Sequence, residues 1–126
     1  MNEPGLTIVN LYTLTGSADA FKAAIERLVA RVRDEGHPGV LSYRFFVNEA
    51  EKSARAVIDY EDAAAWIGHH DIAMGWPEMA GLHGVAALSE VTFLGPLTPE
   101  IQDWIDNSKL TARIRHGNSF AAGFQR

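Results

Sequence analysis

The sequence contains no cysteine among its 126 residues. This absence excludes a disulfide framework, a metal site built on thiolates and a cysteine nucleophile. Cross-links are not needed at this length, because a domain of this size removes roughly two-thirds of its unfolded surface from water when it folds. With 47% hydrophobic and 21% charged residues, the composition is that of one ordinary globular domain.

Basic charge and long apolar runs are also scarce. The formal net charge is −5 and the sequence pI is near 5.4, a balance that repels nucleic acid and anionic lipid. No apolar run is long enough to cross a bilayer, and the first five residues lack the basic start and apolar middle of a signal peptide. We therefore expect a cytoplasmic protein that binds neither nucleic acid nor membrane.

Motifs for metals and for phosphate-bearing cofactors are missing as well. The glycines follow no phosphate-binding spacing, and there is no Gly-x-Ser-x-Gly nucleophile motif. His69 and His70 are neighbours on an expected helix, so their side chains point about 100° apart and do not chelate as a pair. Adding Asp71 and His83 does not complete a metal-ligand spacing. We expect no metal and no cofactor.

The patterns that are present predict an alternation of strands and helices. Runs rich in β-branched and aromatic residues predict four strands, at 7–14, 41–48, 54–60 and 87–94. An apolar stripe between Ser17 and Gly36 predicts one long helix. Glu61 and Asp62 begin a second helix, Pro77 begins a short helical turn, and 81–84 is expected to be a loop. Thr98 and Pro99 begin a C-terminal helix that ends near Ser108.

These elements define one domain and a tail. Residues 1–108 are expected to form a ferredoxin-like β-α-β-β-α-β domain, with the short C-terminal helix included. From Lys109 onward the sequence loses its periodicity, so 109–126 is expected to be a loose tail or an arm that grips a partner chain. The fold class is α+β, with an antiparallel four-stranded sheet and both helices on one face.

The other face of this sheet also receives apolar side chains, because every strand has them on both of its sides. A large exposed apolar sheet face marks an interaction surface. A second copy related by a two-fold axis is the simplest partner. The sequence therefore predicts a homodimer in which two sheets meet and form an α/β barrel.

Several segments resemble the antibiotic-biosynthesis monooxygenase family, whose members form dimeric α/β barrels. They are the first strand T-I-V-N-L-Y-T-L, the helix from Phe21 to Val32, the segment P-G-V-L-S-Y-R, and Y-E-D-A-A-A-W-I-G-H. The last segment has an aromatic and an acidic residue, Tyr60 and Glu61, then an alanine-rich helix start, then His69. The resemblance covers roughly residues 6 to 95.

The resemblance implies a site between helix and sheet. Cofactor-independent and haem-degrading members use an asparagine, a tryptophan and sometimes a histidine there, and this chain has Asn10, Trp66 and His69 as the candidate catalytic residues. Trp66 and His69 lie three residues apart, so they share a helix face. The central tryptophan position of the haem-degrading members is occupied here by His69, which argues against haem degradation.

Aromatic residues supply the candidate substrate-binding wall, namely Tyr12, Tyr43, Phe45 and Trp76. The alternative for each of these side chains is ordinary core packing, which is the more common role of a residue such as Trp76. The same holds for the candidate catalytic residues: Asn10 can pair with backbone, Trp66 can pack, and His69 can be held by a carbonyl group.

Three functional hypotheses follow. The first is a cofactor-independent monooxygenase that acts on an aromatic or quinol-like small molecule, which it binds and orients for reaction with dioxygen. The second is another use of the same pocket, by an isomerase, a decarboxylase or a small-molecule binding protein. The third is a non-catalytic structural dimer, since fold alone does not determine function.

Overall fold

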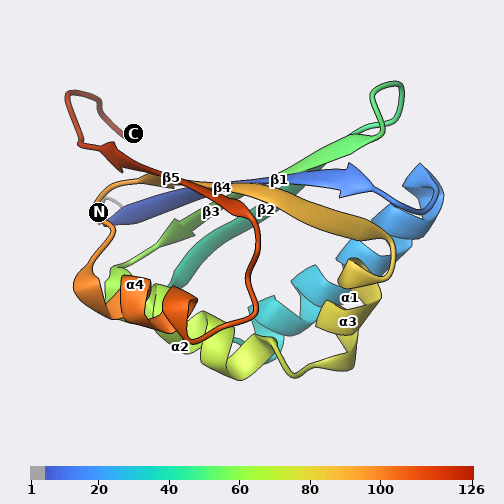
Figure 1. Cartoon of the computed structure of the whole chain (residues 1–126), viewed down its shortest axis with the longest axis horizontal. Coiled ribbons are helices and arrows are strands. Elements are labelled where there is room, and N and C mark those ends of the chain that lie inside the picture. The colour runs from blue at the N-terminus through green and yellow to red at the C-terminus, as the bar shows by residue number, and fades with distance from the viewer. Residues whose placement is uncertain (1–4) are drawn as a thin grey trace.

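The computed structural model describes residues 5–126, so residues 1–4 of the expected 1–108 domain lie outside the described part of the chain. A five-stranded sheet forms one layer and four helices form the other (Figure 1). In chain order the elements are β1 (Leu6–Leu14), α1 (Ala18–Glu35), β2 (Val40–Asn48), β3 (Ser53–Tyr60), α2 (Ala63–Ala73), α3 (Pro77–His83), β4 (Ala86–Leu94), α4 (Pro99–Asp106) and β5 (Arg113–Asn118).

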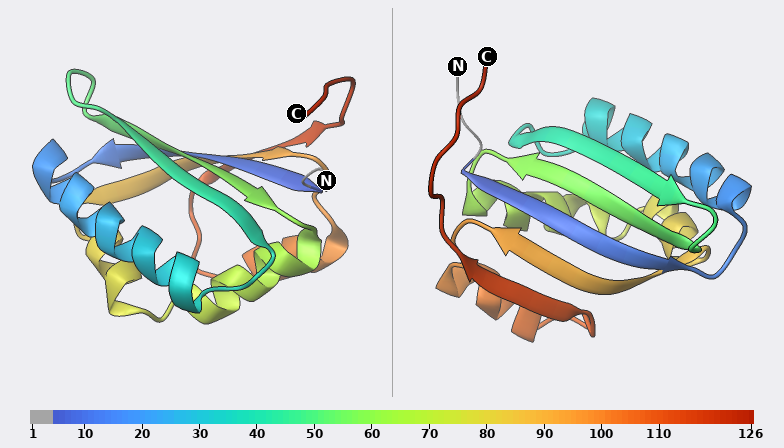
Figure 2. Two further views of the ribbon diagram at one scale, coloured as in Figure 1. Left: turned by 180° about the vertical axis from the view of Figure 1, so that it is seen from behind. Right: turned by 90° about the horizontal axis from the view of Figure 1, so that it is seen from above.

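The strand order across the sheet is β2-β3-β1-β4-β5, which is followed most easily from above (Figure 2). The pairs β1–β3, β1–β4 and β2–β3 are antiparallel, as the ferredoxin-like order requires. The pair β4–β5 is parallel. The α+β class and the order of its first four strands are thus confirmed, and all four helices lie on one face (Figure 1).

Two sequence-based expectations need correction. The sheet has five strands and is mixed, not four-stranded and antiparallel, because the expected tail contains β5. This strand has only one apolar side chain, Ile114, and therefore no alternating pattern; it is held by the edge of β4 through the Glu90–Arg115 ion pair and a bond of 3.0 Å from Asn118 Nδ2 to the Phe93 carbonyl. The segment expected to be a loop at 81–84 is mostly the end of α3.

Helix α1 begins where its sequence signal places it. The Ser17 hydroxyl accepts a hydrogen bond of 3.0 Å from the Ala20 amide and so caps the first turn. Its apolar stripe is buried against the helix-facing side of the sheet and consists of Ala18, Phe21, Ala24, Leu28 and Val32. The sheet contributes Leu6, Ile8, Ala56, Ile58 and Phe93 to the same core. Alternation along the strands thus decides which side chains face the helices.

The outer face of the sheet is more mixed than the sequence analysis expected. Its large exposed apolar side chains include Phe46 and Leu94, and Val9 at its centre is half-buried. Polar groups lie among them: Thr7 donates a hydrogen bond of 2.7 Å to Asp59 on the adjacent strand. Within the described residues, no helix combines the length and the apolarity needed to cross a bilayer.

Helix α2 sits unusually close to the start of β2. A Cβ atom placed on Gly39 would lie 2.5 Å from the Cβ of Ala65, and one placed on Gly68 would lie 2.4 Å from the His37 ring. The two glycines therefore leave the room that Ala65 and the His37 ring occupy at this close contact. At its start, Asp62 accepts a hydrogen bond of 2.8 Å from the Ala65 amide, which fixes the helix in register.

We expect Gly39→Ala to destabilise the fold by about 1–3 kcal/mol, because its new methyl group overlaps the rigid Ala65 methyl and α2 must shift. Chemical denaturation measures this change. Gly75→Ala is the matched control, since a Cβ there meets nothing within 4 Å. Equal stability of the two variants would contradict the close approach of α2.

Candidate functional site

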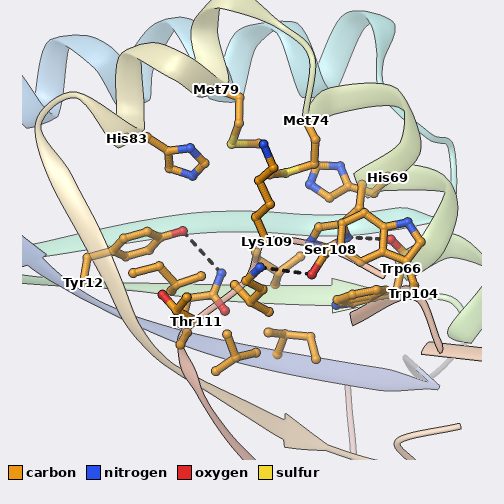
Figure 3. Close-up of a pocket in the computed structure, with 18 of the residues that line it drawn as sticks. Tyr12, Trp66, His69, Met74, Met79, His83, Trp104, Ser108, Lys109 and Thr111 are labelled. Carbon is orange, nitrogen blue, oxygen red and sulfur yellow. Dashed lines mark hydrogen bonds between the residues drawn. The ribbon is translucent and has the colours of Figure 1, made fainter. Parts of the chain in front are cut away.

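A cavity of about 470 Å³ lies between the helix-facing side of the sheet and the helices α2, α3 and α4 (Figure 3). Strands β1 to β4 supply its floor, and the segment 108–112, which connects α4 to β5, supplies one wall. The size of the cavity is in the range of sites for small organic molecules.

Asn10 interrupts the apolar floor. It lies on β1 between Ile8 and Tyr12 on the same face, and all three line the cavity. Its Nδ2 donates to the Tyr12 hydroxyl over 3.4 Å, which is long for a hydrogen bond. Its Oδ1 is buried and has no partner among the described residues. An unpaired buried acceptor costs free energy, so this oxygen is suited to accept a hydrogen bond from a ligand.

Three tyrosines form the aromatic part of the wall. Burial raises the pKa of Tyr12 to about 12, against a smaller lowering effect of the hydrogen bond from Asn10. Burial also raises the pKa values of Tyr43 and Tyr60 above the ordinary value. All three phenols are therefore protonated at neutral pH and offer neutral, hydrogen-bonding surfaces to a ligand.

His69 projects from α2 onto this wall. Its ring lies 5.4 Å from that of Tyr43 and 5.9 Å from that of Tyr60, and the residue is only 2% exposed. Burial lowers its pKa to about 3, with smaller contributions from the neighbouring His70 and His37. The imidazole is thus neutral at pH 7, and its Nδ1 is buried without a partner in residues 5–126. It is a hydrogen-bonding group for a ligand and a weak base.

His70 is held in one tautomer. Its Nδ1 lies 2.7 Å from the Trp66 carbonyl oxygen, which only accepts, so Nδ1 carries the hydrogen and Nε2 is left with its lone pair. The His70 ring also stacks on the Trp66 ring, with their centroids 3.9 Å apart. Residues four apart on a helix lie close enough for this contact. Burial lowers the pKa of His70 to about 4, while the bond to the Trp66 carbonyl acts in the opposite direction.

The C-terminal part of the chain completes the cavity. Trp104 on α4 packs edge-on against Trp66, and its Nε1 donates a hydrogen bond of 2.8 Å to Asp71 of α2. The Ser108 hydroxyl donates to the Ile105 carbonyl and accepts from the Leu110 amide, which orders the turn after α4. These contacts place the segment 108–112 across the side of the cavity (Figure 3).

His83 and Met74 are exposed residues at the mouth of the cavity, while Met79 beside them is buried (Figure 3). Partial burial lowers the pKa of His83, which favours its neutral form at pH 7. Metal-binding geometry is not found at this site: within residues 5–126, no three His, Asp or Glu side chains are close enough together to hold an ion. The cavity is thus a mostly apolar space with a few hydrogen-bonding groups.

The structure brings most of the sequence-predicted residues together. Asn10, Trp66 and His69 line the same cavity, together with Tyr12 and Tyr43. Two predicted residues lie elsewhere. Phe45 packs behind the wall, with its ring 5.0 Å from Tyr43 and 6.3 Å from Tyr12. The Arg31 guanidinium lies over the Trp76 ring, 4.3 Å from the centre of that ring. This contact joins the start of α3 to α1.

Sequence reasoning did not assign Tyr60, His70, His83 and Trp104 to the site, although all four line the cavity. Tyr60 has a usable signal, because it alternates with Ile58 and Ala56 on one strand face. His70 has the four-residue spacing from Trp66. Trp104 has no signal of this kind, because its place depends on how α4 returns to α2 across more than thirty residues of chain.

Comparison with known proteins adds information on the fold. No protein-family model matches the sequence, and no curated protein matches it. Solved structures do match. MupZ from Pseudomonas fluorescens has a TM-score of 0.66 at 18% identity, over 96% of this chain and 93% of its own. SnoaB from Streptomyces nogalater, a cofactor-independent oxygenase, has a TM-score of 0.58 at 16% identity, over 76% of this chain and 96% of its own.

A third structure, of an antibiotic biosynthesis monooxygenase, matches with a TM-score of 0.56 at 15% identity, over 74% of this chain and 99% of its own. The domain is thus an α+β protein with a ferredoxin-like core and a cavity between its layers. It has the fold of the antibiotic biosynthesis monooxygenases, which confirms the fold that the sequence resemblance predicts. The match to MupZ covers so much of the chain that it includes most of the C-terminal segment.

The lowered histidine pKa values make stability depend on pH. The pKa values of His69 and His70 in the fold, about 3 and about 4, lie below the ordinary 6.5, so the unfolded chain binds more protons between these limits. Stability is therefore expected to fall as the pH drops below 6.5, by up to about 1.4 kcal/mol per pH unit for each histidine. The total loss should be smaller for His70, because its pKa falls only to about 4.

Denaturant unfolding between pH 7 and pH 4.5 measures this dependence. His69→Gln keeps a hydrogen-bonding group but removes the titration, so the slope of unfolding free energy against pH should decrease by about one bound proton. An unchanged slope would show that His69 does not stay neutral in the folded chain.

Proposed function

We propose that this chain is a cofactor-independent monooxygenase that acts on an electron-rich aromatic small molecule. The observation that carries the proposal is the cavity itself: an aromatic, largely apolar space lined by Asn10 and His69, each of which has one buried polar atom, Oδ1 and Nδ1, without a partner in residues 5–126. The structural likeness to SnoaB, a cofactor-independent oxygenase, supports it.

The chemistry asks little of the protein beyond binding and orientation. An aromatic substrate with a hydroxyl group becomes a good electron donor when that hydroxyl loses its proton. A methylene group between aromatic rings can then lose its two hydrogens and gain one oxygen atom from dioxygen, while the second oxygen atom leaves with the two hydrogens as water. The substrate supplies all the electrons, so the balance requires no further reductant.

The cavity residues take separate roles in this proposal. The Asn10 amide and the His69 imidazole hydrogen-bond the oxygen substituents of the substrate, while Tyr12, Tyr43 and Trp66 surround its rings. His69 has too low a pKa to remove a phenolic proton efficiently. His83 also lines the cavity, and partial burial favours its neutral form, so it is our candidate acceptor for that proton.

Oxygen uptake with a panel of anthrones and hydroquinones tests the reaction. We expect uptake with an anthrone such as dithranol, and a loss of roughly 10- to 100-fold in kcat/KM for Asn10→Ala, because the hydrogen bond that the Asn10 Nδ2 donates to the reacting anion is removed. Asn107→Ala is the control: it removes an exposed amide at the end of α4, outside the cavity.

Background uptake across the whole panel would reject oxygenation. An isomerase or decarboxylase would instead consume a substrate without oxygen. A binding protein would retain an unchanged molecule, which native mass spectrometry detects.

We also propose that the protein works as a homodimer joined through the outer face of the sheet. Val9, Leu11 and Val57 lie near the middle of that face, and its edge continues into a C-terminal segment whose Phe120 and Phe124 are 74% and 76% exposed. Two aromatic side chains exposed to that extent are better suited to cover a second copy than to face water.

Light scattering during size-exclusion chromatography tests the dimer. A mass of twice the 13.8 kDa chain is expected at micromolar concentration. Val9→Lys introduces a charge at the centre of the proposed interface, so it should shift the protein to the single-chain mass, whereas Ala23→Lys on the exposed side of α1 should not. A wild-type protein of single-chain mass would contradict the proposal.

A further inference from the structure

The described residues that line the cavity include one positively charged side chain and no negatively charged one. Among the described residues that line it there is no aspartate or glutamate, and its three tyrosines and three histidines favour their neutral forms at pH 7. One side chain with a formal charge remains, that of Lys109. This is unexpected for a chain whose net charge is −5.

Lys109 is an exposed residue that also lines the cavity. Figure 3 shows its side chain extending from the segment 108–112 towards Met79. It forms none of the ion pairs found in residues 5–126, which involve Arg31, Arg33 and Arg115. Its ammonium group is therefore not neutralised by a carboxylate of the described chain.

The backbone beside Lys109 is fixed. Ser108 bridges the end of α4 to the Leu110 amide through two hydrogen bonds of 2.6 and 3.1 Å, and Trp104 is tied to Asp71 of α2. The lysine thus projects from an ordered wall, which limits the positions that its ammonium group can reach.

A second observation concerns His69 on the cavity wall. The residue is 2% exposed and its Nδ1 is buried without a partner in residues 5–126, so a polar group of a ligand suits it better than an apolar one. A molecule that satisfies both His69 and Lys109 is amphipathic: an aromatic body with a neutral hydroxyl or carbonyl group for the imidazole and a negative charge for the ammonium group.

We propose that the cavity takes an aromatic carboxylate, whose rings occupy the apolar space and whose carboxylate group pairs with the Lys109 ammonium at the mouth. The inference rests on the proposed use of the cavity as a small-molecule site, and not on the oxygenation step. Lys109 is a specificity-determining residue in this arrangement, because a charge-assisted hydrogen bond at a partly desolvated mouth favours an anion over its neutral analogue.

Binding of two matched probes tests the proposal. The probes are 6-hydroxy-2-naphthoate and the neutral 6-hydroxy-2-naphthamide, which share the aromatic body and the hydroxyl group. Titration calorimetry, with quenching of tryptophan fluorescence as a second readout, gives both dissociation constants. We expect the wild-type protein to bind the carboxylate about three- to tenfold more tightly than the amide, and the preference to decrease with added salt.

Variants then assign the preference to Lys109. Lys109→Met keeps the apolar stem and removes the charge, so the carboxylate should lose its advantage while the amide binds as before. Lys109→Arg should keep the preference. Lys22→Met is the matched control, because it removes one positive charge from the exposed side of α1, away from the cavity.

The outcomes separate this inference from the oxygenase proposal. An equal preference in wild type and Lys109→Met, or no binding of either probe, overturns the anion site. If neutral anthrones support oxygen uptake, and if the preference for the carboxylate probe is the same with and without Lys109, the anion site is overturned and the oxygenase proposal stands. A preference that depends on Lys109, with oxygen uptake at background, supports the anion site and rejects the oxygenase.

Discussion

The packing of α2 against the sheet is the contact on which the site depends. Gly39 and Gly68 remove the side chains that would hold the helix away from the start of β2, and Asp62 fixes where the helix begins. Trp66 and His69 are then carried onto the sheet face by ordinary helical periodicity. The cavity is what remains between this helix and a strand face that has small and polar residues, Asn10 and Ala86, where larger apolar groups would fill the space.

Burial also determines the chemistry of these side chains. A histidine placed among tyrosine rings loses the water that would stabilise its charged form, so it becomes a neutral hydrogen-bonding group. Its desolvation costs folding free energy, and the unpartnered Nδ1 adds to that cost. A fold that retains such a residue in its core, together with the unpartnered Asn10 oxygen, trades stability for a polar point inside an apolar space, as binding sites commonly do.

The sequence was sufficient for what local patterns determine. Alternation in T-I-V-N-L-Y-T-L placed Asn10 and Tyr12 on one strand face, and three-residue spacing placed Trp66 and His69 on one helix face. It was insufficient where long-range contacts decide. Phe45 lies on the same strand face as Tyr43, but it packs behind that residue and does not reach the cavity. Strand β5 lacks apolar alternation, so its sequence does not reveal it; pairing with β4 holds it in the sheet. Lys109 belongs to the site only because α4 returns to α2.

The same desolvation that neutralises His69 acts on any substrate hydroxyl in the cavity. An apolar environment disfavours a phenolate just as it disfavours an imidazolium, so a reactive anion needs hydrogen-bond donors at its oxygen. The Asn10 amide is suited to this task, because its present bond to the Tyr12 hydroxyl is 3.4 Å long and is exchanged at little cost for a shorter bond to an anion. The protonated Tyr12 hydroxyl is a second donor at the same place. A neutral cavity thus becomes compatible with anionic chemistry through donors that are already present on β1, while Lys109, the one formally charged residue of the described lining, is exposed and keeps its charge near water.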